Sequence, residues 1–135
     1  MNISEAAAES GVPAKTIRYY EEIGLVRPPR LANGYRVFGT AELAALAFVG
    51  RARSLGFSVE DCRALLALER NESRHSQDVK AIAAGHLTRI EAKIAELEEM
   101  RARLKPLVTR CHGDQRPECP IMDDLRLQSG APADV

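Results

Sequence analysis

The chain has 135 residues, with 19 lysines and arginines against 19 aspartates and glutamates. This length allows one domain or a small domain with an extension, and the balanced charge excludes a globally basic nucleic-acid coat while leaving room for a local basic face. No apolar run approaches the roughly 20 residues that a membrane span needs, and residues 1–5 lack the features of a signal peptide. We therefore expect a cytoplasmic protein without a membrane partner, in which three cysteines indicate metal or redox chemistry over structural disulfides.

Two short helices are expected first, over residues 3–10 and 14–23. Gly11 and Gly24 are placed to end them, and Pro13 suits a first helical turn. Two helices around a tight glycine turn are typical of a helix-turn-helix, whose second helix enters the major groove of DNA. An ordinary helical hairpin within a core is the alternative.

A short basic hairpin is expected next. Asn33-Gly34 is a strong hairpin turn, residues 35–38 alternate as a strand, and a hairpin this small must pack on the helices. Beside a helix-turn-helix it would be a wing that reaches the phosphate backbone or an adjacent groove, although its arginines could instead be simply solvated. The expected DNA-binding residues are Lys15, Arg18, Tyr19, Arg30, Asn33, Tyr35, Arg36 and Arg53.

Two further helices follow. Thr40 is expected to cap a helix from Ala41 to Leu55, and Ser58 to cap one from Val59 to about residue 68. Cys62 falls inside the second of these. A lone helical cysteine is usually a small buried hydrophobe, with a role as a metal ligand as the alternative.

A long helix is expected to begin near residue 77, with Ser76 as its N-cap. Its apolar positions alternate at spacings of four and three, the pattern of a heptad seam, with Arg101 as a break. The N-terminal unit is too small to bury this seam, so we expect it to pair with the same helix of a second chain, parallel or antiparallel; intramolecular packing is the alternative. Pro106 is expected to kink or loosen the last turns. The expected dimerisation residues include Leu87, Ile90, Ile94, Leu97 and Leu104.

Two cysteines, Cys111 and Cys119, bracket a loop rich in turn-forming residues. A short amphipathic helical turn over 120–125 and a disordered tail over 126–135 are expected to follow. Two thiolates with few hard donors favour a soft ion, chiefly Cu(I) and similarly Ag(I) or Au(I), whereas Zn(II) prefers four ligands. His75 and His112 are the nearest additional donors, and a disulfide is the alternative for the cysteine pair.

Three segments, 1–4, 16–25 and 33–36, closely resemble the MerR family of bacterial transcription regulators. The segment from Cys111 to Pro120, followed by Ile121 and Leu125, resembles the copper-efflux branch of that family, the CueR and HmrR type. The resemblance implies a mainly α fold: a winged helix-turn-helix DNA-binding domain over 1–70, a dimerisation helix over 71–110 in an antiparallel coiled coil, and a metal-binding loop with a short helix over 111–125.

The same resemblance implies a function. A homodimer would bind palindromic promoter DNA with an over-long spacer and, on binding Cu(I), distort it so that RNA polymerase engages both elements and transcribes copper-efflux genes. Divalent sensors of the family place a third, partner-chain thiolate where this chain has Ser76, which favours a monovalent ion. The net charge of a two-thiolate Cu(I) unit would be offset across the dimer interface by Lys80 and the helix N-terminus.

The sequence also allows other functions. A sensor of Zn(II) or Hg(II), a thiol redox regulator and a pure coiled-coil adaptor are the alternatives. No Ser/His/Asp set, phosphate-binding loop or paired-carboxylate motif is present, so the chain is not expected to be an enzyme.

Overall fold

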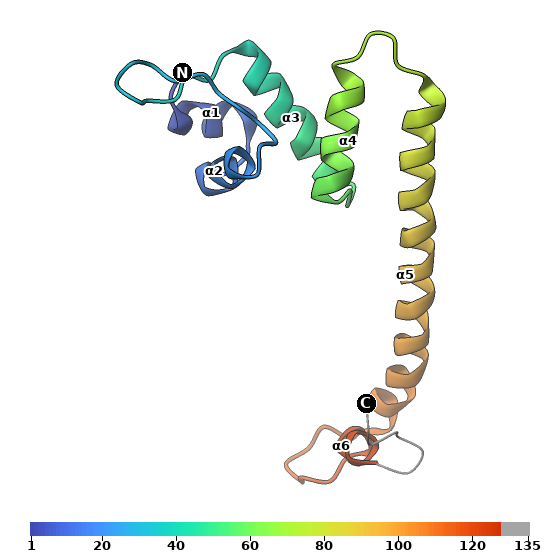
Figure 1. The fold of residues 1–135 in the computed structure, drawn as a ribbon. Coiled ribbons are helices and arrows are strands. Elements are labelled where there is room, and N and C mark those ends of the chain that lie inside the picture. The colour runs from blue at the N-terminus through green and yellow to red at the C-terminus, as the bar shows by residue number, and fades with distance from the viewer. Residues whose placement is uncertain (128–135) are drawn as a thin grey trace. The chain divides into compact units, whose positions relative to one another are not determined.

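The computed structural model describes residues 1–127, which fall into two compact units, Met1–His86 and a second unit that begins at Leu87. The fold is mainly helical, as expected (Figure 1). Its helices are α1 (Ile3–Ser10), α2 (Ala14–Glu22), α3 (Thr40–Ser54), α4 (Val59–Glu69), α5 (Ser76–Arg110) and α6 (Pro120–Arg126). None of the helices within residues 1–127 is both long and apolar enough to cross a bilayer.

Local sequence explains the first two helices. Asn2 and Glu5 form a capping box, in which each side chain accepts a hydrogen bond from the backbone N–H of the other, satisfying two donors that a helix start leaves unpaired. Gly11 follows α1 and Gly24 closes the turn after α2, both at φ values near +76°, a left-handed conformation that costs glycine little. The expected helix-turn-helix is therefore present, with α2 one residue shorter than expected.

The core of the first unit joins α1 to α4 and the base of the hairpin. Ile17, Val26, Phe38, Leu46 and Val49 are among its most buried side chains. Val26 and Phe38 lie on either side of the hairpin, and Phe38 is further held by Met1, whose amino group donates to the Phe38 carbonyl at 2.9 Å while the Phe38 N–H donates back at 2.8 Å. The base of the hairpin is thus fixed to the core.

The hairpin itself is shorter than expected. Within residues 1–127 it contains no strand, only a single antiparallel bridge between Arg30 and Arg36, so the strand expected over 35–38 is wrong. Pro28 and Pro29 provide the physical reason, because proline lacks the N–H that a longer ladder would need. The turn around Gly34, at φ +88°, is present as expected.

The starts of α3 and α4 differ in how they are capped. Gly39, not Thr40, is the N-cap of α3, and the Glu42 carboxylate accepts the Gly39 N–H at 2.7 Å. The expected cap at Thr40 is wrong because the acidic side chain three residues after Gly39 already satisfies that donor. Ser58 caps α4 as expected, accepting from the Asp61 N–H at 3.0 Å.

Helix α5 is the longest element and continues through Pro106 to Arg110. Its buried residue is His86, which lies in the first compact unit with the turn between α3 and α4. The His86 ring Nε2 lies 2.8 Å from the Leu55 carbonyl oxygen, and the ring centroid lies 4.5 Å from that of Phe57. Because a carbonyl only accepts, Nε2 carries the proton in this contact. This end of α5 therefore packs with the first compact unit, which runs to His86.

In the second unit, α6 lies near the C-terminal end of α5 (Figure 1), and Arg103 of α5 pairs with Asp124 of α6 at 3.7 Å. Arg126 is the last residue of α6. The disordered tail expected over 126–135 is therefore wrong at Arg126, whose guanidinium pairs with Asp123 one turn back. Residues 128–135 of that tail lie outside the described part of the chain.

Candidate DNA-binding surface and metal-binding loop

One concave surface of the first unit brings together four basic residues from α2 and the hairpin. Five of the expected DNA-binding residues line it: Lys15, Arg18, Tyr19, Arg30 and Arg36. Two carboxylates, Glu21 and Glu22, line it as well. The first three residues come from α2 and the two arginines from the hairpin, so the surface combines the second helix of the motif with the wing.

The two hairpin arginines are bound to α2 through one carboxylate. Arg30 Nη2 donates to Glu21 Oε2 at 2.9 Å, and Arg36 Nε donates to Glu21 Oε1. Arg30 also donates through Nη1 to the Gly34 carbonyl at 2.8 Å, across the hairpin turn. The Glu21 side chain is only 17 % exposed, so this three-residue network, Glu21–Arg30–Arg36, is partly shielded from water, which strengthens its electrostatics relative to a fully solvated pair.

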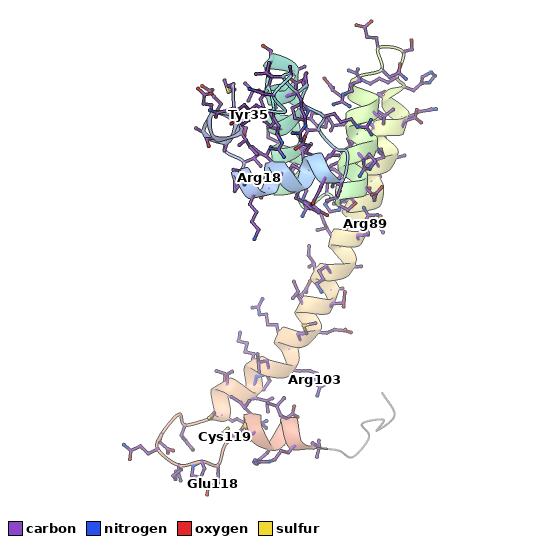
Figure 2. All side chains as sticks on the ribbon, turned by 60° about the vertical axis from the view of Figure 1, so that its left-hand side comes forward. Arg18, Tyr35, Arg89, Arg103, Glu118 and Cys119 are labelled. Atoms are coloured by element: carbon purple, nitrogen blue, oxygen red, sulfur yellow. The ribbon has the colours of Figure 1, made fainter. Side chains whose placement is uncertain are left out.

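The remaining expected DNA-binding residues lie apart from this surface. Tyr35, 71 % exposed, and Asn33 lie in the hairpin turn, where Asn33 Oδ1 accepts the Tyr35 N–H at 3.1 Å; Figure 2 labels Tyr35 in the hairpin and Arg18 on α2. Arg53 lies at the end of α3 and donates to the Phe57 carbonyl at 2.6 Å. Its guanidinium therefore helps to hold the turn between α3 and α4.

Both cysteines of the loop are free thiols, partly exposed, at the ends of helices. Cys111 directly follows α5, and its N–H donates to the Leu107 carbonyl at 3.1 Å. Cys119 is the N-cap of α6, and its Sγ accepts the Met122 N–H at 3.4 Å; Figure 2 shows Cys119 where the loop meets α6. Each helix thus fixes the backbone that carries one thiol.

The loop between the cysteines has internal structure of its own. The Asp114 carboxylate accepts hydrogen bonds from the Arg116 side chain and backbone at 2.9 Å each, and these bonds hold the pKa of Asp114 below its usual value. Gly113 adopts φ +66°. His112 is exposed. The loop between the two cysteines therefore contains an ordered turn.

Cys111 and Cys119 are the soft donors that the loop offers to a metal ion. Within residues 1–127 no three histidine, cysteine or acidic side chains gather as metal ligands would. Cys62 does not join them: it is fully buried in the core, and burial raises the pKa of its thiol, an effect opposed by Arg53 and reinforced by Asp61. Cys62 is thus the small buried hydrophobe that its position predicted.

Ser76 and Lys80, expected beside the metal, lie in the first turns of α5 and are exposed. Cys111 follows the last residue of the same helix. Ser76 and Lys80 therefore belong to the first compact unit and Cys111 to the second.

The expected seam is exposed in the single chain. The side chains of Leu87, Ile94, Leu97 and Leu104 are 49–54 % exposed, and Ile90 is 37 % exposed. Met100 and Val108 are also exposed. A row of half-exposed aliphatic side chains along one helix is the usual sign of an interaction surface, so intramolecular burial of the seam, the alternative, is not what the described residues show.

Two contacts were not anticipated from sequence. Glu21 was not singled out because a glutamate near the end of a helix looks like an ordinary solvated residue, and only the hairpin's return brings two arginines to it. His86 does not interrupt the heptad pattern, so the sequence does not mark it as unusual. Its position one residue before Leu87, at the edge of the seam, is the feature that could have indicated a buried contact.

A helix-turn-helix with a basic concave surface, followed by a long helix with an exposed apolar seam, defines a helical DNA-binding protein. Comparison with known proteins specifies the class. The chain matches the family model described as "MerR HTH family regulatory protein" over residues 1–69 and that described as "MerR, DNA binding" over residues 43–107.

Individual relatives agree over nearly the whole chain. The chain is 54 % identical to the transcriptional regulator HmrR of Rhizobium leguminosarum bv. viciae, over 93 % of this chain and 97 % of that protein. It is 44 % identical to the transcriptional regulator CueR of Yersinia pestis, over 93 % and 91 %. The crystal structure of the transcription regulator PbrR691 from Ralstonia metallidurans CH34 in complex with lead(II) superposes with a TM-score of 0.78 at 27 % identity, covering 93 % of this chain and 98 % of that one.

The chain therefore belongs to the MerR family of helix-turn-helix transcription regulators. It is a DNA-binding regulator of transcription and not an enzyme, as expected from sequence.

Proposed function

We propose that this protein is a Cu(I)-responsive transcriptional activator of copper-efflux genes, with Ag(I) and Au(I) as further inducers, that acts in the cytoplasm as a homodimer. The observation that carries the proposal is the donor set of the loop: two partly exposed free thiols, Cys111 and Cys119, with no third strong donor grouped with them in residues 1–127. Soft thiolates with low coordination suit a closed-shell monovalent ion. The similarity to HmrR and CueR and to a lead-bound relative supports a metal as the signal.

The proposed homodimer is antiparallel. Pairing α5 with its partner in this sense would bring Ser76 and Lys80 of one chain to the cysteine loop of the other. Two thiolates and one monovalent ion carry a net charge of −1, and burying such a charge is unfavourable unless it is compensated. The Lys80 ammonium and the positive end of α5 would provide the compensation, and the Ser76 hydroxyl, a poor ligand for a soft ion, would leave the two-thiolate set unchanged.

The proposed output is a change in promoter DNA. The concave surface of α2 and the hairpin would bind each half of a palindromic promoter through Lys15, Arg18, Tyr19, Arg30 and Arg36. Asn33, Tyr35 and Arg53, which lie apart from this surface, would make further contacts. Distortion of an over-long spacer on metal binding would then let RNA polymerase engage both promoter elements. A sensor of Zn(II) or Hg(II) is the second candidate, which the lead-bound relative favours.

One experiment separates these candidates: transcription from the cognate promoter titrated with Cu(I), Zn(II) and Hg(II). Cys111→Ser and Cys119→Ser should each abolish the Cu(I) response while leaving DNA binding intact, because the loop and the DNA-binding surface belong to different units. Cys62→Ala is the matched control and should retain the response, alanine being chosen because the site is fully buried.

Ser76→Cys provides the metal test. A third thiolate should strengthen the response to Hg(II) and reduce discrimination in favour of Cu(I), because it adds a negative charge that the site does not offset. A wild-type response to Zn(II) equal to that for Cu(I), or an unchanged metal profile in Ser76→Cys, would refute the monovalent assignment.

A further inference from the structure

The negative charge of Glu21 should disfavour DNA binding, but its contacts point to a role that favours it. Glu21 is an acidic residue on the surface that we propose faces DNA, where its carboxylate repels phosphate. Its side chain is nevertheless the common partner of Arg30 and Arg36. We propose that Glu21 is a positioning residue, which holds the hairpin and its two arginines against α2 so that helix and wing meet DNA as one preformed surface.

The weakness of the hairpin is the first argument. Arg30 and Arg36 form its single bridge, and two-stranded ribbons of this size are at best marginally stable alone. Pairing with the core fixes the base of the hairpin at Phe38, but the turn beyond the bridge, including the exposed Tyr35, has no sheet to support it. Glu21 binds both partners of the bridge at the same carboxylate, and thus joins the hairpin to α2 at the point where the ladder ends.

The geometry of the arginines is the second argument. Arg30 donates to Glu21 through one nitrogen and to the Gly34 carbonyl through another, so the guanidinium spans the carboxylate and the turn. A guanidinium presents five donors in a fixed plane, and these two bonds set its orientation while leaving further N–H groups available. An arginine ordered in the free protein loses less conformational entropy on binding than a free one.

The charge of the network is the third argument. Two arginines and one glutamate leave a net charge of +1, so the network remains attractive to phosphate. The carboxylate is mostly covered, at 17 % exposure, while Arg30 is 49 % and Arg36 is 29 % exposed. The positive groups of the network therefore face solvent more than the negative one does.

This inference rests on the proposed placement of DNA against α2 and the hairpin. Glu21→Gln tests it because a charge-only role and a positioning role predict opposite changes in promoter affinity. If Glu21 acts only through its charge, Glu21→Gln should bind a promoter fragment more tightly and with a steeper salt dependence, since one repulsive charge is gone. The positioning role predicts weaker binding, by about tenfold at fixed salt, because two side chains and the turn must be ordered on binding.

Glu22→Gln is the matched control. Glu22 is the next residue, is exposed, and lines the same surface, so the substitution removes the same charge without touching the network. It should leave binding slightly tighter. Glu21→Asp is the second variant: it keeps the charge but shortens the side chain, and should weaken binding like Glu21→Gln. Thermal melting of each variant checks that the fold is retained.

The outcomes separate the inference from its premise. Weaker binding by both Glu21 variants, with Glu22→Gln equal to or tighter than wild type, supports the positioning role. If Arg18→Ala and Arg36→Ala weaken binding but Glu21→Gln binds as tightly as wild type or more so, the placement of DNA holds and the positioning role is wrong. If Arg18→Ala and Arg36→Ala both bind as wild type does, DNA does not lie on this surface and both proposals are overturned.

Discussion

Replacing Leu97 with aspartate should convert the protein to monomers. Leu97 is 51 % exposed in the single chain, so about half of the Leu97 side-chain surface can still be buried in a dimer. Full burial of a leucine is worth about 1.5–3 kcal/mol, which leaves about 1 kcal/mol per side chain for association. Because a two-fold dimer contains Leu97 twice, Leu97→Ala should weaken association by about 2 kcal/mol, or roughly 30-fold.

Leu97→Asp should have a larger effect than the alanine variant. It removes the same apolar contact and adds two uncompensated carboxylates to the interface, which raises the total to at least about 4 kcal/mol, or roughly a thousandfold in the dimer dissociation constant. Promoter binding should weaken with it, because each half-site supplies only part of the affinity. Sedimentation velocity over a concentration series measures the first effect, and a gel shift measures the second.

The matched control is Ala95→Asp, which adds the same charge one position along from Ile94, on the outer side of the heptad pattern. It should sediment as wild type does. A Leu97→Asp variant that remains dimeric at all concentrations, or an Ala95→Asp variant that dissociates equally, would refute the assignment of this seam as the dimer interface.

Three further results are expected. His86→Ala should lower the free energy of unfolding by about 2 kcal/mol, through the lost bond to the Leu55 carbonyl and the lost ring contact, which chemical denaturation would measure; an unchanged midpoint would mean that the contact carries no stability. The pKa of Cys62 is raised in the folded state, so the thiol's contribution to stability is present below the pKa of the unfolded state and is lost as pH rises through the pKa of the folded state. Wild type should therefore lose stability relative to Cys62→Ala above about pH 9. Parallel stability profiles against pH for the two proteins would contradict this. Gly34→Ala forces a side chain into φ +88° and should cost about 1 kcal/mol and weaken DNA binding. Unchanged promoter affinity would show that the turn is not used.

Hydrophobic periodicity and the residues that begin or end helices predicted most of the helices, because the causes of these helices are local. The glycines after α1 and α2, the serine before α4 and the heptad spacing of α5 act within a few residues, and the boundaries expected from them are correct to within about two residues. The cap of α3 failed for a local reason too: Gly39 and Glu42 form the capping pair, and a threonine beside them looked like the better candidate. The strand failed because the prolines at 28 and 29 limit a ladder that alternation alone would allow.

The arrangement of the DNA-binding surface was less accessible from sequence. Charge clustering identified Arg30 and Arg36, but it treated each as a free cation, whereas both contact Glu21. No pattern predicts that pairing, because it depends on how the hairpin returns across α2. Arg53 shows the same limit: its positive charge predicts a phosphate contact, but no pattern predicts its hydrogen bond to the Phe57 carbonyl.

The position of His86 gives the proposed dimer a mechanical consequence. Ser76 precedes His86 by ten residues on α5, a rise of about 15 Å along the helix, while a chain's own Cys111 lies beyond the other end of that helix. In an antiparallel pair, the cysteine loop of one chain would lie near the partner's Ser76, and so within about three helical turns of the partner's His86 contact with the turn between α3 and α4. A metal that reshapes the loop would therefore act on the DNA-binding unit of the partner chain more directly than on its own, because the shorter connection runs through the partner's helix. Mixed dimers, in which one chain carries Cys111→Ser and Cys119→Ser and the other carries His86→Ala, would distinguish a connection through the partner's α5 from a connection through the chain's own α5.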